Sequence, residues 1–207
     1  MEIFIISVGA GDNDDLFISF EIRSGEMRDI QRFLIPITVY TDLSLKVGEV
    51  DQSVFEAVEL EAKVYAAHRK ALYLLSFGSQ SAKVLKQKLV MRGCEAEIAG
   101  LAVERLIENR LLCNESSALR EAEKCVEKLW GQVRIRAHLA QKGYSEAEIK
   151  KAFFALEDDG VDFTLNCSKL IDKRYLPLPK DKKDLQKIIA ALQRYGYSIS
   201  QIKACIK

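Results

Sequence analysis

Apolar residues recur at spacings of three and four in three stretches of the chain that align on a glycine. An aliphatic residue stands eight positions and four positions before that glycine in every stretch. The stretches are LKQKLVMRG (Leu85–Gly93), IRAHLAQKG (Ile135–Gly143) and IIAALQRYG (Ile188–Gly196). This spacing puts side chains on one stripe of an α-helix, and glycine is the usual residue just past a helix end. Each stretch therefore predicts a helix that stops at its glycine.

The apolar pattern resumes six residues after each glycine, so a further helix is predicted there. Its positions are Ala99, Ala102, Val103 and Leu106 in the first copy, Ile149, Ala152, Phe153 and Leu156 in the second, and Ile202, Cys205 and Ile206 in the third. A repeat of about 50 residues is too small to bury its own apolar face. We expect an array whose core forms where neighbouring repeats stack.

The first 50 or so residues have the alternating, β-branched character of strands. Apolar runs at 3–8 and 16–22 are separated by GAGDNDD (9–15), which is typical of a turn. A third run, 33–35, meets a proline, which suits a strand end or an edge. The segment 37–45 fits either a strand or a short helix. A small antiparallel sheet is predicted.

From residue 53 the pattern is helical to the end of the chain. The predicted helices are 54–76, one from Ser81 to Gly93, 95–110, 117–130, 132–142, one opened by a capping box at Ser145, a third-repeat helix from near Val161, 184–195 and 200–206. The expected fold is mainly α, with three tandem three-helix repeats after a small β segment (α+β overall). The predicted domains are 1–52, 53–112 (a long linking helix and repeat 1), 113–159 (repeat 2) and 160–207 (repeat 3).

The net charge of +1 conceals two oppositely charged regions. Residues 1–65 hold 5 Lys/Arg and 13 Asp/Glu, a net charge of −8. The remainder holds 26 Lys/Arg and 17 Asp/Glu, a net charge of +9. Such a division points the basic region towards polyanions or acidic protein surfaces, although a solvated surface without a ligand has the same counts.

The middle helix of each repeat carries cations outside its apolar stripe. They are Lys83, Lys86 and Arg92, then Arg134, Arg136 and Lys142, then Lys183, Lys187 and Arg194. Stacked repeats would align them as a basic track, whose phosphate contacts would be salt-sensitive. No aromatic residues stand out between them, so any nucleic-acid contact is expected to be weak, non-specific and with the backbone. The alternative is a helix surface charged only for solubility.

The residues that commonly carry catalysis do not form a recognisable set. Gly9 and Gly11 lack a third glycine and are followed by aspartates, so a hairpin turn is favoured over a nucleotide loop. His68 and His138 lie within predicted helices without a paired nucleophile, and are expected to face solvent or another helix. An enzyme site in the acidic N-terminal region is the alternative. We predict a protein that is not an enzyme and has no metal or cofactor.

The cysteines and apolar runs bear on where the protein resides. The five cysteines form no CxxC pair and are expected to be inert, reduced thiols: Cys94, Cys113, Cys125, Cys167 and Cys205. No apolar run reaches the roughly 18 to 20 residues of a membrane span, and MEIFIISV lacks the basic start of a secretory signal. We expect a cytoplasmic monomer that does not bind membranes.

The order and spacing of several short motifs resemble the RecX family over nearly the whole chain. A lead ending in glycine, LSLKVG, precedes the repeats. The matching positions are Ala71, Leu72, Leu74, Leu75, Ser81 and Leu89, the block Leu112–Ala118, the block WGQVRI (Trp130–Ile135), Leu139, and the pair Gly143-Tyr144. The departures are Cys113-Asn114 where the family has two aspartates, Gln132 for proline, Gln80 for arginine and Val84 for glutamate.

The resemblance implies a regulator of the RecA recombinase. RecX-like proteins bind along the groove of RecA–single-stranded DNA filaments and generally restrain filament growth, ATP turnover, strand exchange and repressor cleavage. A different hypothesis stays open from the residues alone. Three-helix units also resemble helix-turn-helix modules, so the chain could bind DNA independently of RecA.

Overall fold

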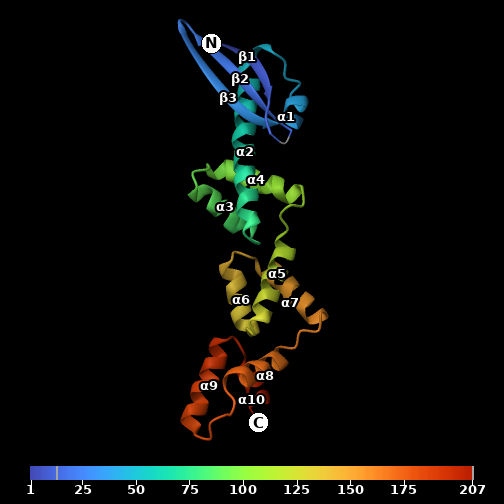
Figure 1. The fold of residues 1–207 in the computed structure, drawn as a ribbon, viewed down its shortest axis with the longest axis vertical. Coiled ribbons are helices and arrows are strands. Elements are labelled where there is room, and N and C mark those ends of the chain that lie inside the picture. The colour runs from blue at the N-terminus through green and yellow to red at the C-terminus, as the bar shows by residue number, and fades with distance from the viewer. Residues whose placement is uncertain (13, 207) are drawn as a thin grey trace. The chain divides into compact units, whose positions relative to one another are not determined.

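The computed structural model describes residues 1–12 and 14–206; Asn13, within the predicted 9–15 turn, lies outside them. The chain divides into two compact units. Unit 1 comprises Met1–Phe77 and Lys86–Leu111, and unit 2 comprises Gly78–Leu85 and Leu112–Lys207. Figure 1 labels their helices and the three long strands.

Unit 1 begins with the predicted antiparallel sheet. Its strands are β1 (Glu2–Ala10), β2 (Asp15–Ser24), β3 (Met27–Pro36) and β4 (Gly48–Val50), in the order β3-β2-β1-β4. The turn between β1 and β2 confirms the hairpin expected around the first glycines. The short strand β4 was not predicted, and the ambiguous segment after β3 forms the helix α1 (Ile37–Asp42).

Alternate residues on one face of the sheet are buried against helix α2 (Gln52–Ser76). In Figure 1 the first half of α2 overlaps the sheet. Ile5 pairs with Phe20 across β1 and β2, and both side chains are buried. The ring of Phe20 meets those of Phe33 and Phe55 edge to face, with centroids 5.8 and 5.1 Å away. Such contacts add to the hydrophobic stabilisation from burying the rings.

A buried carboxylate also holds α2 to the sheet. Asp15, at the start of β2, is 4% exposed. Its Oδ1 accepts a 2.5 Å hydrogen bond from the hydroxyl of Tyr65, and its Oδ2 lies 3.7 Å from the guanidinium of Arg69. Burial and this hydrogen bond raise the pKa of Tyr65 to about 12, so the tyrosine stays protonated as the donor.

The second half of α2 packs on α4 (Ala96–Glu108), and these helices with α3 (Ala82–Met91) form the first repeat. Val64 and Ala67 of α2 are buried with Ile98 and Ala102 of α4. Residues 82–85 of α3 group with unit 2 and the remainder with unit 1. The predicted stripe of α3 is buried at Leu85 and at Leu89.

Unit 2 holds the other two repeats. Their helices are α5 (Asn114–Glu127), α6 (Gln132–Gln141) and α7 (Glu146–Asp158), then α8 (Phe163–Arg174), α9 (Lys182–Arg194) and α10 (Ile199–Cys205). In each repeat the first helix packs against the third. The fold class predicted from the sequence, tandem three-helix repeats after a small β segment, is confirmed. The predicted domain limits of 1–52, 53–112, 113–159 and 160–207 stay a prediction.

The predicted helix ends are mostly observed. Gly93, Gly143 and Gly196 have φ values of +85°, +82° and +95°, which glycine adopts without steric cost. Ser145 forms the predicted capping box with Glu148. One helix start was wrong: α5 begins at Asn114, three residues before the expected Ser117.

Tertiary contacts explain the earlier start of α5. The Asn114 side chain accepts a 2.9 Å hydrogen bond from the Ala82 amide and donates one of 2.9 Å to Glu148. These partners hold Asn114 in place although both are far from it in the sequence. The prediction weighed only local capping residues and therefore placed the start at Ser117, whereas the N-cap residue is Cys113.

Candidate interaction surface on the second and third repeats

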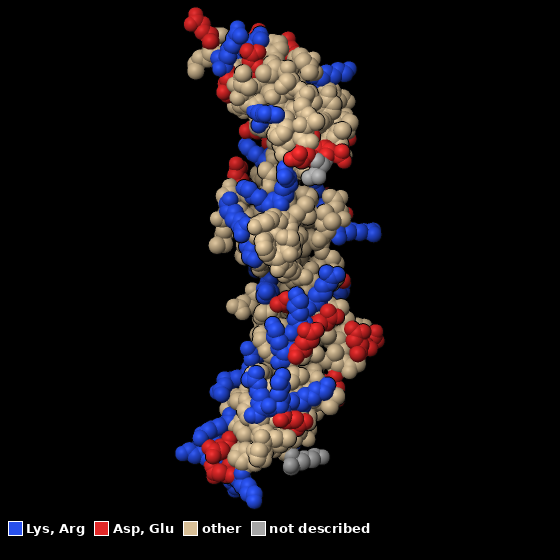
Figure 2. Space-filling view, in the orientation of Figure 1, with Lys and Arg blue, Asp and Glu red and all other residues tan. Residues whose placement is uncertain are grey.

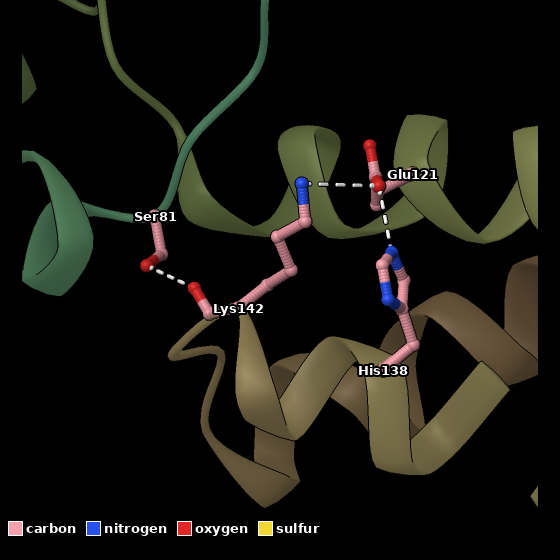
Figure 3. A network of polar contacts seen from close by, with 4 residues as sticks. All are labelled: Ser81, Glu121, His138 and Lys142. Carbon is pink, nitrogen blue, oxygen red and sulfur yellow. Dashed lines mark hydrogen bonds and ion pairs between the residues drawn. The ribbon is translucent and has the colours of Figure 1, made fainter. Parts of the chain in front are cut away.

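Within unit 2, the start of α3 is joined to the end of α6 through Ser81. Its side chain is 1% exposed and donates a 2.6 Å hydrogen bond to the backbone carbonyl of Lys142 (Figure 3). The same hydroxyl accepts a 3.3 Å hydrogen bond from the amide of Val84. Ser81 thus caps α3, as predicted, and also satisfies a carbonyl at the end of another helix.

The glycine that follows Lys142 allows this close approach. A Cβ built on Gly143 would lie 2.9 Å from Oγ of Ser81 and 3.2 Å from Cγ2 of Val84. It would also lie 3.5 Å from Cβ of Lys83. Glycine is therefore required here for two reasons, its positive φ and the space that it leaves.

A partly buried carboxylate reinforces the end of α6. Glu121 of α5 accepts a 2.9 Å hydrogen bond from Nε2 of His138, and its Oε1 lies 3.4 Å from Nζ of Lys142 (Figure 3). Burial alone would raise the pKa of Glu121, but the contacts with His138 and Lys142 outweigh it and hold this pKa below its ordinary value. His138 is therefore an interhelical histidine, one of the two placements predicted for it.

A second joint links α6 to the end of α9 through the backbone. The amide of Gly131 donates a 2.8 Å hydrogen bond to the carbonyl of Tyr195, and the amide of Val133 donates one of 3.1 Å to the carbonyl of Gly196. A Cβ on Gly131 would fall 2.3 Å from the carbonyl carbon and oxygen of Gly196. The hydroxyl of Tyr197 adds a 2.9 Å hydrogen bond to the carbonyl of Leu129.

The two joints are equivalent. Ser81 stands twelve residues before Gly93, and Gly131 stands twelve residues before Gly143. Each lies at the start of a middle helix and contacts the glycine turn that ends the middle helix of the next repeat. The alignment of the three glycines in the sequence therefore corresponds to a repeated contact in space.

Cationic and aromatic side chains alternate across the second joint, in what we call the cation–aromatic ladder: Lys128, Trp130, Arg134, Tyr195 and Arg174. Cζ of Arg134 lies 3.9 Å from the ring centroid of Trp130 and 5.4 Å from that of Tyr195. Cζ of Arg174 lies 5.3 Å from the Tyr195 centroid, and this arginine also donates a hydrogen bond to the tyrosine hydroxyl. Nζ of Lys128 lies 5.7 Å from the Trp130 centroid.

This ladder corrects the expectation that no aromatic residues lie between the cations. The rings were missed because Trp130 and Tyr195 belong to different repeats and meet only at the joint. Each ring directly precedes a glycine, Trp130 before Gly131 and Tyr195 before Gly196, and this was the available signal. In other proteins, aromatic rings among cations stack on nucleic-acid bases while arginines contact phosphates, so the ladder removes the reason for expecting backbone contact alone.

The predicted cations differ in their contacts: some lie beside a glycine turn, and others form ion pairs. In unit 2, Lys83 lies beside the Lys142–Gly143 turn, and Arg134 lies beside the turn that follows Arg194. Arg136 pairs with Glu146, and Lys187 pairs with Asp184 at 2.7 Å. Figure 2 shows Lys and Arg side chains gathered over the part of unit 2 that α6 and α9 form.

Several predicted cations are free for an external partner. Lys83, Lys183 and Arg194 are exposed and form no ion pair within residues 1–12 and 14–206. Lys86 and Arg92 are exposed and belong to unit 1, where Nζ of Lys86 lies against Gly100. Two of the nine cations therefore belong to unit 1 and seven to unit 2. At the joints of unit 2, Lys83 lies beside the turn after Lys142, and Arg134 lies beside the turn after Arg194.

In the described part of the chain, no cluster of three or more His, Cys, Asp or Glu residues could hold a metal ion. The described cysteines are all free thiols. Cys125 and Cys167 are buried, and burial raises the pKa of each thiol above its ordinary value.

Comparison with known proteins assigns the family. No family model matches the chain. A protein of Clostridioides difficile named regulatory protein RecX is 30% identical over 177 residues, which cover 80% of this chain and 78% of that protein. The chain belongs to the RecX family. The regulatory protein RecX of Xanthomonas citri is also 30% identical, over 67% of this chain and 85% of that protein.

Solved RecX structures share the fold of this RecX family member. A crystal structure of regulatory protein RecX superposes with a TM-score of 0.76 at 21% identity and covers 98% of both chains. The RecX of Lactobacillus salivarius gives a TM-score of 0.60 at 18% identity over 70% of this chain. No helix of the described residues combines the length and the apolar character that crossing a membrane requires.

Proposed function

We propose that this RecX family member is a non-enzymatic regulator of the RecA recombinase. It binds RecA–single-stranded DNA filaments and restrains their extension, ATP hydrolysis, strand exchange and coprotease activity during DNA repair and the SOS response. Relatives that match most of the chain are named regulatory protein RecX, which supports a regulatory role. The proposal implies a cytoplasmic monomer that needs no cofactor.

The repeated joint is the observation that carries this proposal. At each joint, the start of one middle helix lies against the end of the next middle helix. The contacts are those of Ser81 with Gly143 and of Gly131 with Gly196. Cations recur beside both joints, with Lys83 at the first and Arg134 at the second. Positive charge that recurs with the repeats suits a partner that is itself repetitive, because several modest contacts then add up by avidity.

The binding surface that we propose is the set of basic residues on the three middle helices. They are Lys83, Lys86, Arg92, Arg134, Arg136, Lys142, Lys183, Lys187 and Arg194. A single exposed ion pair contributes at most about 1 kcal/mol, so binding of this kind needs several cations at once. The phosphates of the bound strand and acidic side chains of RecA are the anions that this surface would meet.

The test measures RecA ATP hydrolysis and strand exchange on single-stranded DNA with stoichiometric amounts of the protein. Both rates are expected to fall. The double variant Lys183→Glu with Arg194→Glu should inhibit much less, because both side chains are exposed and unpaired among the described residues. The matched control is Lys124→Glu with Lys150→Glu, which changes the charge equally at exposed positions outside the proposed surface. Rates unaffected by the unaltered protein would refute the proposal.

The second candidate is a protein that binds DNA without RecA, and the cation–aromatic ladder favours it. Arg134 lies between the rings of Trp130 and Tyr195, an arrangement that suits bases and phosphates of a single strand. This candidate requires tight, salt-dependent binding of labelled DNA by the protein alone. The RecA proposal tolerates weak DNA binding, provided that the filament is still bound.

A further inference from the structure

A pocket of about 500 Å³ lies wholly within unit 1 and is lined by both apolar and charged side chains. Its walls come from the segment around α1, from one face of α2 and from the last turn of α4. Glu61, Tyr65 and His68 line it from α2, at spacings of four and three that place them on a single helical face.

The charges in the pocket walls favour a cation. Three carboxylates line the pocket, those of Asp42, Glu61 and Glu108, against the guanidinium of Arg105. Arg105 is already occupied, because it donates hydrogen bonds of 2.9 and 3.1 Å to both oxygens of Glu61. Asp42 and Glu108 form no ion pair in the part of the chain that the structure describes. Two carboxylates are therefore left without a counter-charge.

The end of α4 adds to this negative potential. Glu108 is the last residue of that helix, and Asn109 is its C-cap. A helix C-terminus carries partial negative charge, and a cation near it is stabilised. The N-terminal part of the chain, which supplies most of the pocket walls, is also negatively charged: residues 1–65 carry a net charge of −8.

The inner wall offers flat rings and an unsatisfied nitrogen. The rings of Tyr65 and His68 are nearly parallel, with an interplanar angle of 15° and centroids 6.5 Å apart. Nε2 of His68 is buried and has no hydrogen-bond partner among the described residues. Burial first, and then the charge of Arg105, lower the pKa of His68, so its ring is neutral near pH 7 and does not repel a cation.

We infer that this pocket binds the guanidinium group of an arginine side chain on a protein partner. Guanidinium is planar, binds carboxylates with paired donors and stacks on rings, whereas an ammonium group is a point charge that does neither as well. A protein source is favoured over a free metabolite because Leu43, 37% exposed, and Pro36 place apolar surface at the pocket, where residues flanking the arginine can pack. The inference is independent of the proposed function, because it requires neither RecA nor DNA.

The test titrates the full-length protein with the peptide acetyl-Gly-Arg-Gly-amide and follows backbone amide signals by NMR. Saturable shifts are expected for amides of residues 38–43, 61–68 and 105–109. The peptide with citrulline keeps the shape and loses the charge, and should bind at least tenfold more weakly, roughly the effect of removing one charge-assisted hydrogen bond. The lysine peptide and free L-arginine, whose own carboxylate is repelled, should also bind more weakly.

Substitutions in the walls provide the second half of the test. Asp42→Asn with Glu108→Gln is expected to weaken binding of the arginine peptide roughly tenfold. Both positions are exposed, so these changes should leave the remaining amide signals in place. The control, Glu2→Gln with Glu49→Gln, removes the same charge from exposed positions outside the pocket and should not change binding.

Four results would overturn the inference. They are the absence of saturable shifts, equal binding of the citrulline or lysine peptide, tighter binding of free L-arginine than of the peptide, and unchanged affinity in the variant that lacks both carboxylates.

Discussion

Gly196 of the third repeat lies so close to Arg134 of the second that a Cβ built on the glycine would fall 2.5 Å from Cβ of Arg134. Real Cβ contacts are essentially never this short, so an alanine at this position would force the two repeats apart. The joint between them therefore depends on a hydrogen atom in place of a side chain.

Gly196→Ala is expected to destabilise the protein by about 2 to 4 kcal/mol, from the clash at the joint and the positive φ together. The matched control is Gly160→Ala, since Gly160 has a φ of +77° but no neighbouring atom within 4 Å of a built Cβ. The control should lose only about 1 kcal/mol. The free energy of unfolding in urea measures both, and equal losses would show that the contact with Arg134 does not matter.

Ser81→Ala is expected to cost about 1 to 2 kcal/mol of unfolding free energy. The substitution removes the hydrogen bond to the Lys142 carbonyl and the cap of α3 together. Ser116→Ala is the comparison, because Ser116 is exposed and its hydroxyl donates a hydrogen bond to the nearby carbonyl of Cys113. A decrease at Ser81 no larger than that at Ser116 would contradict the role of the first joint.

The lowered pKa of Glu121 predicts that part of the stability is lost in acid. Its folded pKa lies below the unfolded value of 4.5, so the unfolded state binds more protons between the two values. The contribution of Glu121 is therefore fully present above the unfolded pKa and disappears as the pH falls through the folded pKa. Urea unfolding at pH values from about 7 down to about 3 measures it.

The variant Glu121→Gln should be less stable than the original chain at neutral pH, and the difference should shrink in acid. Glu123→Gln is the control, because Glu123 is exposed and forms no ion pair within the described residues. The free energy of unfolding of Glu121→Gln is compared with that of the original chain at each pH. If the difference does not change with pH, the interaction of Glu121 with His138 and Lys142 is not its source.

The cation–aromatic ladder predicts how DNA binding responds to salt. Arg134→Gln with Arg174→Gln should reduce the slope of log K against log salt concentration by about 1 for each phosphate that is no longer neutralised. The double change Lys124→Gln with Lys150→Gln removes the same charge elsewhere in unit 2. Anisotropy of labelled single-stranded DNA supplies the slopes. Identical slopes for the two variants would mean that the ladder has only a structural role.

The sequence predicted the features of the repeats that local patterns encode. Apolar stripes such as Leu85 with Leu89 are buried, and Gly143 and Gly196 have the positive φ expected of helix ends. These features depend on residues three to eight positions apart, so periodicity reveals them. The sequence alone also led to the RecX resemblance, which the relatives and solved structures confirm.

The joints and the pocket could not be predicted because their residues are distant in the chain. Ser81 meets Lys142 across 61 positions, and Arg105 meets Glu61 across 44. A serine before a helix looks like an ordinary cap until its second partner is known. The surroundings of Trp130 and Tyr195 likewise become informative only when the repeats are in contact.

Co-sedimentation with RecA–single-stranded DNA filaments tests the central claim most directly. With ATP present and at low salt, the protein is expected to pellet with the filaments at near-stoichiometric amounts, less at high salt, and much less when Lys183 and Arg194 are replaced by glutamate. A protein that remains in the supernatant at both salt concentrations, while filaments pellet normally, would contradict the proposal that it regulates RecA by binding the filament.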